Sequence, residues 1–283
     1  MTPQDQGALH VGIAGIGLLG PGLADWAQAQ ALLCQPDQWA TRATVVDAPT
    51  RLPATERRRA GLLVKASVCV ADQACAMAGI DAATLATVFT SSTGEPSNCH
   101  ALCETLATPQ RLVSPTRFTN SVHNAAAGYW HIAVGSVHAS TSLAGFDASL
   151  GAGLLEAMAQ CCSTQRPVLL VACDLPYPEP LHHLRPLADV FAVALLLLPV
   201  GAELPNPPMQ ATRLSLALGP DATDTPCRDP GLERLRCSIP AARALPLLEA
   251  LAAGRSGAFV LGGPPGLSLR LGLSLRLGLG STA

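Results

Sequence analysis

The fold is decided by the stretch Asp147-Ala-Ser-Leu-Gly-Ala-Gly-Leu-Leu-Glu-Ala-Met-Ala-Gln-Cys-Cys162 and by two apolar runs behind it, Pro167-Val-Leu-Leu-Val-Ala-Cys173 and Val190-Phe-Ala-Val-Ala-Leu-Leu-Leu-Leu198. Apolar residues recur four apart in the first stretch, which predicts a helix with one apolar face. The two runs lack any polar alternation, which is typical of strands buried on both faces. Buried strands combined with helices predict an α/β layered architecture, with helices on both faces of a central sheet.

The alternation of strands and helices extends toward the N-terminus. The pattern predicts strands over His10–Ile16, Ala43–Asp47, Thr87–Ser92 and Ser140–Leu143. It predicts helices over Glu56–Met77, Ser97–Leu106 and Asn124–Val134.

The sequence changes character after Pro199, where eight prolines fall between residues 205 and 246. We expect only a helix over Leu245–Ala253 and a strand over Ala258–Leu261 in this part. The hexamer Leu267-Ser-Leu-Arg-Leu-Gly272 is then repeated as 273–278, which predicts one strand with leucines on one face. Identical hexamers specify strand register weakly, so an uncovered edge here would favour aggregation.

The composition limits the classes of protein. Apolar residues make up 49% and charged residues 13% of the 283 residues, against roughly 25% charged in typical domains. This balance excludes a long disordered chain. It indicates either a large buried fraction or a surface covered by another subunit. The net charge of −2 and an aromatic share of 4% argue against nucleic-acid binding.

Cysteine use and hydropathy predict a cytoplasmic protein without a membrane span. The ten cysteines form no C-x-x-C pair, and most lie in apolar runs, which favours free thiols in a reducing compartment. The longest apolar run, Val190 to Val200, is 11 residues long, whereas a membrane-spanning helix needs about 20. We see no signal peptide at the N-terminus.

Gly15-Ile-Gly17-Leu-Leu-Gly20 follows a predicted strand and matches the G-x-G-x-x-G pattern of dinucleotide sites, with Asp47 as a candidate ribose-binding acid. Pro21-Gly22 stands where the helix of such a site should continue, and the distance to Asp47 exceeds the usual spacing of about 20 residues. The alternative is a tight turn after the strand.

Two further patterns suggest chemistry, each with a structural alternative. Cys99-His100 and Cys103 fall on one predicted helix, but a closed zinc site needs four ligands and no second pair is near. His123, Ser142 and Asp147 suggest a catalytic triad, yet no G-x-S-x-G elbow surrounds Ser142 or Ser149, and such residues near a helix start are common caps. His182-His183 is expected to be a solvated loop.

The stretch Ser114-Pro-Thr-Arg-Phe-Thr-Asn-Ser-Val-His-Asn-Ala-Ala-Ala-Gly-Tyr-Trp130, between Val88-Phe-Thr-Ser-Ser-Thr-Gly94 and Val168-Leu-Leu-Val-Ala-Cys-Asp174, resembles the β-ketoacyl synthase-like N-terminal domain family. That family includes chain length factor partners in aryl polyene and related polyketide pathways. The resemblance implies a thiolase-like layered fold with a central mixed sheet between helices, similar to a truncated ketosynthase. It divides the chain into a ketosynthase-like domain at 1–200 and a Pro-rich segment with a short α/β remainder at 201–283, packed on the same domain.

The chain departs from active ketosynthases at the catalytic positions. The family's cysteine nucleophile lies where a strand meets a helix, and that slot falls here at Phe146 or Asp147. No His-Gly-Thr-Gly-Thr motif follows His183, the last histidine. The resemblance therefore implies a non-catalytic subunit that pairs with a full-length β-ketoacyl-ACP synthase in fatty acid or polyketide biosynthesis and shapes the acyl tunnel. No cofactor or metal is expected.

The resemblance also suggests which residues carry this role. Expected partner or tunnel residues are Phe118, Asn120, His123, Asn124, Tyr129, Trp130 and Phe146. The basic run Arg57-Arg58-Arg59 is either a solvated helix start or a contact for an acidic acyl carrier protein. Two alternatives remain open: a self-sufficient acyltransferase or thioesterase using Ser142 or Ser149, or a nucleotide-binding reductase. A degraded homologue with a purely structural role is a third.

Overall fold

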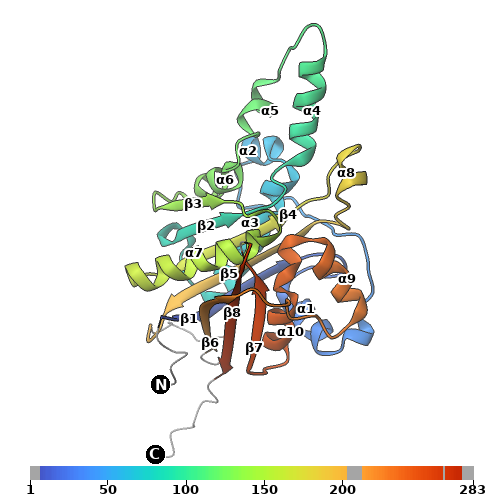
Figure 1. Cartoon of the computed structure of the whole chain (residues 1–283). Helices are drawn as coiled ribbons and strands as arrows, with labels where there is room; N and C mark the ends of the chain where they lie inside the picture. Colours follow the sequence, from blue (N-terminus) through green and yellow to red (C-terminus); the bar gives the residue numbers. More distant parts are fainter. Residues whose placement is uncertain (1–6, 203–211, 264, 276–283) are drawn as a thin grey trace, which may run out of the picture.

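The protein folds around one mixed eight-stranded sheet. A computed structural model describes residues 7–202, 212–263 and 265–275. The strand order is β3-β2-β4-β5-β1-β6-β8-β7. The strands, seen in Figure 1, are β1 (Leu9–Leu19), β2 (Ala86–Thr90), β3 (Ser140–Leu143), β4 (Val168–Asp174), β5 (Phe191–Pro199), β6 (Thr212–Pro220), β7 (Gly257–Gly262) and β8 (Leu267–Leu275). Strands β3, β2 and β4 are mutually parallel, and every later neighbour pair is antiparallel.

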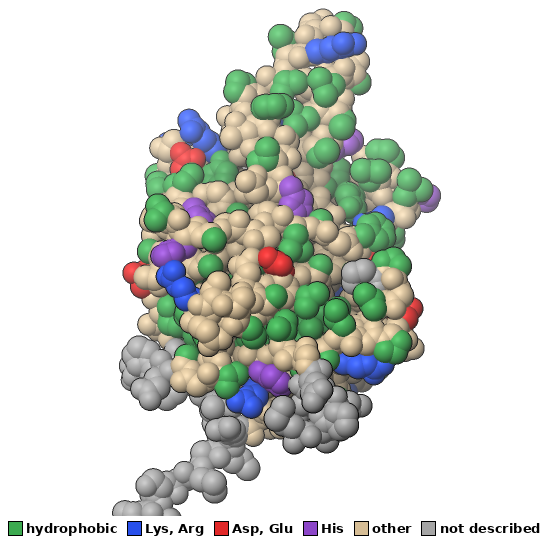
Figure 2. Space-filling model, turned by 60° about the vertical axis from the view of Figure 1, so that its left-hand side comes forward, with side chains coloured by type: hydrophobic (Ala, Val, Ile, Leu, Met, Phe, Trp, Pro, Cys, Tyr) green, Lys and Arg blue, Asp and Glu red, His purple; other side chains and the backbone are tan. Residues whose placement is uncertain are grey.

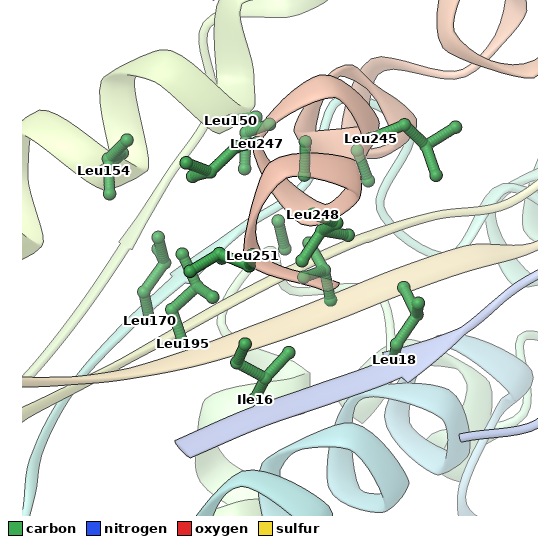
Figure 3. Close-up of a cluster of buried hydrophobic side chains, with 14 of the residues drawn as sticks. Ile16, Leu18, Leu150, Leu154, Leu170, Leu195, Leu245, Leu247, Leu248 and Leu251 are labelled. Carbon is green, nitrogen blue, oxygen red and sulfur yellow. The ribbon is translucent and has the colours of Figure 1, made fainter. Parts of the chain in front are cut away.

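Helices cover both faces of the sheet, as expected for the layered α/β fold. One face packs against α3 (Leu62–Ala78) and α6 (Ala125–Val134). The opposite face packs against α1 (Trp26–Cys34), α7 (Ser149–Thr164), α9 (Pro230–Ser238) and α10 (Leu245–Ala252). Figure 3 shows this second core, where Leu150 and Leu154 of α7 face leucines of α10 above Leu170 and Leu195 of the sheet.

The remaining elements are short, apart from one helical arm. Helices α4 (Pro96–Ala107) and α5 (Pro115–Thr119) project from the body at the top of Figure 1. Helices α2 (Ala54–Arg59) and α8 (Leu181–Leu184) lie in connections, with 3₁₀ turns η2 (Pro36–Gln38), η3 (Ala82–Thr84), η4 (Phe146–Ala148) and η5 (Pro240–Ala244). No helix in the described parts of the chain combines the length and apolar character that crossing a membrane requires.

The expected helix over Glu56–Met77 is two helices, α2 and α3. The backbone becomes extended at Ala60, with φ −64° and ψ 128°, so the first helix ends there. Glu95 then caps the second helix by accepting a hydrogen bond from the amide of Leu63 at 2.9 Å. A Cβ at Gly61 would lie 2.2 Å from the same carboxylate, which explains the glycine. Apolar periodicity missed the break because it carries no information about this long-range cap.

The segment Ala43–Asp47 is not a strand, contrary to expectation. Thr44 bonds to the chain before β5, since its amide donates to Asp189 at 2.8 Å and its hydroxyl donates to the carbonyl of Val190 at 2.9 Å. These two bonds, one of them to a side chain, attach the segment at the start of β5, and it forms no strand ladder.

The G-x-G-x-x-G pattern does not form a dinucleotide site. Gly15 and Gly17 lie inside β1, where a Cβ would come within 2.0 Å of the Ala74 carbonyl oxygen and 1.8 Å of the Val70 carbonyl oxygen in α3. The glycines therefore permit close approach of helix and strand. A phosphate-binding loop needs free backbone amides at the start of a helix. Gly15 and Gly17 lie within a strand, so their amides do not stand at a helix start.

The C-terminal part holds more regular structure than the prolines predicted. Strand β6 and helix α9 form between prolines, which stand at their ends as Pro220 and Pro230. The leucine-repeat strand is confirmed over Leu267–Leu275; its predicted continuation to 279 lies outside the described residues. Strands β6 and β7 pair with its two edges, so the repeat is not an open edge.

Helix α9 carries an ion pair that makes the free energy of unfolding depend on pH in the acidic range. Arg236 donates to both carboxylate oxygens of Glu233 at 2.7 Å, and this bond lowers the pKa of Glu233 from 4.5 to about 2. A lowered pKa in the folded state adds stability above the unfolded value, which is lost as the pH falls from about 4.5 toward 2.

We therefore expect Glu233→Gln to flatten this part of the stability profile. Urea unfolding at about pH 5 and about pH 3 should give a smaller difference in the variant, by about 1–2 kcal/mol. Equal differences in parent and variant would refute the assignment.

Candidate functional site

The strand-to-helix junction between β3 and α7 holds the predicted nucleophile slot. Phe146 occupies a left-handed backbone conformation there, with φ +53°. Ser149 stabilises the turn, because its buried hydroxyl accepts from the Gly145 amide at 3.0 Å and donates to the Phe146 carbonyl at 2.7 Å. The hydroxyl of Ser149 is thus engaged on both sides, which argues against its use as a nucleophile.

An arginine from the β4–β5 connection covers this junction. The guanidinium carbon of Arg185 lies 3.8 Å from the centroid of the Phe146 ring. Its Nη2 atom donates to Asp147 Oδ1 at 2.5 Å and to the hydroxyl of Ser92 at 2.9 Å. Asp147 is therefore an ion-paired carboxylate, and Phe146 a capped ring that is still 64% exposed.

A chain of charges continues from the slot into the C-terminal part. Arg243 of η5 lies 3.7 Å from Asp147 and 3.7 Å from Asp224. Asp224 is also 3.3 Å from Arg236 of α9. The charged residues around the slot therefore alternate between arginines and carboxylates, each linked to the next by an ion pair.

Asp174 joins three segments beneath the slot. It is 1% exposed at the end of β4 and accepts hydrogen bonds from the amides of Ser92, Thr93 and Ala241 and from the hydroxyl of Ser91. Burial raises the pKa of its carboxyl group, while these four donors oppose the shift. Neither Asp174 nor Arg185 was singled out from the sequence. A polar residue ending a buried strand was a visible signal for Asp174, but nothing marked Arg185 in its loop.

The residues of the Ser114–Trp130 stretch divide into a buried and an exposed set. Asn120 is buried; its amide group donates to the Arg59 carbonyl at 2.8 Å and accepts from the Tyr129 hydroxyl at 3.0 Å. Trp130 is fully buried under α3. Asn120 therefore links the end of the arm to α2, and the side chains of Asn120, Tyr129 and Trp130 pack inside this chain.

Three of the expected residues in the Ser114–Trp130 stretch are exposed instead. Phe118 on α5 is 68% exposed, and Asn124 stands at the start of α6 without a side-chain cap. His123 is exposed, with Nε2 3.4 Å from the carbonyl oxygen of Ser91. Large exposed apolar side chains on and beside the arm are Leu106, Leu112, Phe118 and Val122, and Figure 2 shows apolar side chains over this projection.

The arginine run opens onto a groove of about 430 Å³ between α2, α4 and α5. Arg58, Arg59 and Arg117 line it, together with the half-buried Glu95. Arg59 lies 3.6 Å from Glu56, while the described residues offer Arg58 and Arg117 no ion-pair partner. Arg57 is half-buried outside the groove.

The alternative sites do not assemble. Cys99 and Cys103 are exposed on α4, and the described residues contain no group of three metal-binding side chains. His100 pairs with Glu104 instead, at 3.3 Å. Within the described ranges, no hydrogen bond joins His123, Ser142 and Asp147 to one another. His182 and His183 lie in the short helix α8 and not in the expected loop; His183 is exposed, and His182 is half-buried.

The sheet order, the two helical layers and the strand-to-helix slot define a thiolase-like, ketosynthase-type fold. The chain belongs to the family described as β-ketoacyl synthase, N-terminal domain, whose model matches residues 24–229. No curated protein sequence matches it.

Solved structures agree on the fold. A chain from the complex of a ketosynthase (ApeO) with its chain length factor (ApeC) from Xenorhabdus doucetiae has a TM-score of 0.69 at 22% identity, over 93% of this chain and 99% of the other. The ishigamide ketosynthase/chain length factor gives 0.69 at 15% identity, over 95% and 100%. A type II polyketide synthase assembly of acyl carrier protein and ketosynthase, AntDE:AntF, gives 0.69 at 12% identity, over 95% and 99%.

Proposed function

We propose that this protein is a non-catalytic, chain-length-factor-like subunit. It pairs with a full-length β-ketoacyl-ACP synthase in polyketide biosynthesis of the aryl polyene type, or in fatty acid biosynthesis, and shapes the acyl tunnel. The observation that carries the proposal is the slot, where Phe146 and an ion-paired Asp147 stand in place of a nucleophile. The family match supports the ketosynthase-like class.

Five of the ten cysteines are poorly suited to act as nucleophiles, because burial raises their pKa values. A cysteine nucleophile requires a thiol with a lowered pKa. Burial instead raises the pKa of Cys69 to about 11 and that of Cys75 and Cys161 to about 12. Burial raises the pKa of Cys173 and Cys227 as well. Free thiols of this kind suit a reducing compartment, so we place the complex in the cytoplasm.

Strand β3 and the arm offer a surface for the partner synthase. Strand β3 ends the sheet, with only β2 beside it in the described chain. Exposed apolar side chains flank it, including Ile132 at 55% and Val137 at 96% exposure. An unpaired edge beside apolar side chains is a surface that another subunit would cover.

Co-expression with a tagged full-length ketosynthase from the same organism tests the proposal, with native mass as the readout. We expect a stable one-to-one complex. Phe118→Asp should weaken it without unfolding the chain, because the side chain is exposed, while Leu218→Asp on β6 should not. A chain that purifies alone as a homodimer and ignores the synthase would refute the pairing.

We further propose that the arginine groove contacts an acyl carrier protein. Its arginines attract an acidic surface, and the effect should weaken with salt. Arg58→Glu combined with Arg117→Glu should lower the affinity of the complex for the carrier by at least about tenfold at low salt. Arg255→Glu, exposed near β7, serves as the control. Equal affinities would place the carrier elsewhere.

Phe146 is the residue we expect to limit the acyl chain. Its ring is largely exposed and so faces out of this chain, toward whatever covers the junction in the complex. Phe146→Ala should lengthen the products or broaden their length distribution, measured by mass spectrometry of the acyl products. Ser163→Ala, at an exposed position near the C-terminal end of α7, should leave them unchanged. Products identical to those of the parent would show that Phe146 does not limit the length of the acyl chain.

A further inference from the structure

Arg185 contacts the slot through two kinds of interaction at once. The face of its guanidinium lies against the Phe146 ring, 3.8 Å from the centroid, while Nη2 bonds to Asp147 and Ser92. The Tyr177 ring is also within reach, 5.9 Å from the guanidinium carbon. With the side chain 24% exposed, the cation is partly shielded from water, and both interactions gain from that.

Only arginine can make this set of contacts. A guanidinium is planar, so its face stacks on a ring while its edge donates hydrogen bonds in the same plane. A lysine ammonium is a point charge that can keep the ion pair with Asp147 or approach the ring, but offers no flat face. Arg185 therefore couples the ring of Phe146 to the carboxylate next to it in sequence.

The Phe146 backbone and its ring are held by different groups. Ser149 fixes the turn, in which Phe146 has the positive φ that non-glycine residues seldom adopt. That conformation turns the ring outward, where it is 64% exposed and has Arg185 over one face. The backbone conformation thus sets the direction in which the Phe146 side chain leaves the turn, and Arg185 sets the orientation of its ring.

We propose that Arg185 is a positioning residue that fixes the Phe146 ring and thereby helps to set product length. This inference rests on the proposed function, in which Phe146 limits the acyl chain. Asp147 and Ser92 are the anchors that hold the guanidinium in place.

The first test observes the ring in the purified full chain. 4-Fluorophenylalanine placed at position 146 gives a single ¹⁹F resonance that reports the ring's surroundings. Arg185→Met should shift and narrow this resonance, Arg185→Lys should shift it too, and Asp147→Asn should shift it less. Arg228→Met, which removes an arginine 4.0 Å from Glu249 elsewhere, is the matched control and should leave it in place. A resonance unmoved by Arg185→Met overturns the proposal.

The second test measures product length in the complex with the synthase. Arg185→Met should change the distribution in the same direction as Phe146→Ala, and the double variant should go no further than Phe146→Ala alone. If Phe146→Ala alters the products and Arg185→Met does not, Arg185 has no role in setting product length, and the proposed function stands. If neither alters them, the role given to Phe146 fails and the inference falls with it. A purely structural arginine would lower thermal stability and leave both readouts unchanged.

Discussion

Gly17→Ala is expected to destabilise the protein by at least about 3 kcal/mol, because the added methyl group would meet backbone that cannot turn aside. A Cβ at this position would lie 1.8 Å from the carbonyl oxygen of Val70 and 2.6 Å from its carbonyl carbon. Helix α3 must therefore move away from β1, and the packing between them is among the most extensive in the molecule. Urea unfolding followed by circular dichroism gives the free energy directly.

Gly12→Ala is the matched control for this experiment. Gly12 lies in the same strand, yet its nearest neighbours would be 3.8 Å from a Cβ, an ordinary contact distance. The change should stay within about 0.5 kcal/mol of the parent, since alanine also restricts the unfolded chain. Equal effects at the two positions would show that the helix does not approach β1 as closely as these distances indicate.

The same glycines show where sequence pattern fails. Gly15, Gly17 and Gly20 match a phosphate-binding motif in spacing. Spacing alone cannot distinguish a glycine that leaves its backbone amide free to bind phosphate from a glycine that lets a helix pack close to the strand. At Gly20 a Cβ would lie 2.6 Å from the ring of Phe191, again a packing reason. The motif needs a turn and a helix directly after the strand, and β1 instead runs on to Leu19.

Elements whose signal is local were predictable. The apolar face of α7 and the unbroken apolar runs of β4 and β5 predicted the correct type for these elements, with boundaries within about two residues. Because both faces of these strands are buried, nearly every position along them is apolar, and the sequence shows this directly. The break at Ala60 and the loop at Thr44 were missed, because Glu95 and Asp189 determine them from distant parts of the chain.

The candidate site divides in the same way. Phe146 and Asp147 lie at the predicted junction between a strand and a helix, and such a junction is a local feature of the sequence. Arg185 was not predicted, because 38 residues separate it from Asp147 and nothing in its loop marks a partner. Asn120, Tyr129 and Trp130 were predicted as partner or tunnel residues, and all three lie buried in this chain; a conspicuous motif can serve packing as well as recognition.

Asp174→Asn is expected to cost about 3 kcal/mol, even though the side chain keeps its shape. Both carboxylate oxygens accept hydrogen bonds: Oδ1 from Ser91, Ser92 and Thr93, and Oδ2 from the amide of Ala241 at 2.8 Å. An amide side chain must turn its NH₂ group toward one of these sets of donors. A buried N–H facing another N–H loses both hydrogen bonds and gains repulsion.

The loss of these hydrogen bonds should also disturb the residues around Phe146. Ser92 also binds Arg185, and Ala241 lies two residues before Arg243. We therefore expect Asp174→Asn to lower the free energy of unfolding and also to shift the ¹⁹F resonance of a fluorinated Phe146. Asp81→Asn is the control: Asp81 is an exposed cap whose Oδ1 accepts from Ala83, a role that asparagine fills equally well, so the change should stay within about 0.5 kcal/mol. A stable Asp174→Asn variant would mean that the three segments meeting there are held by their apolar contacts, with the carboxylate contributing little.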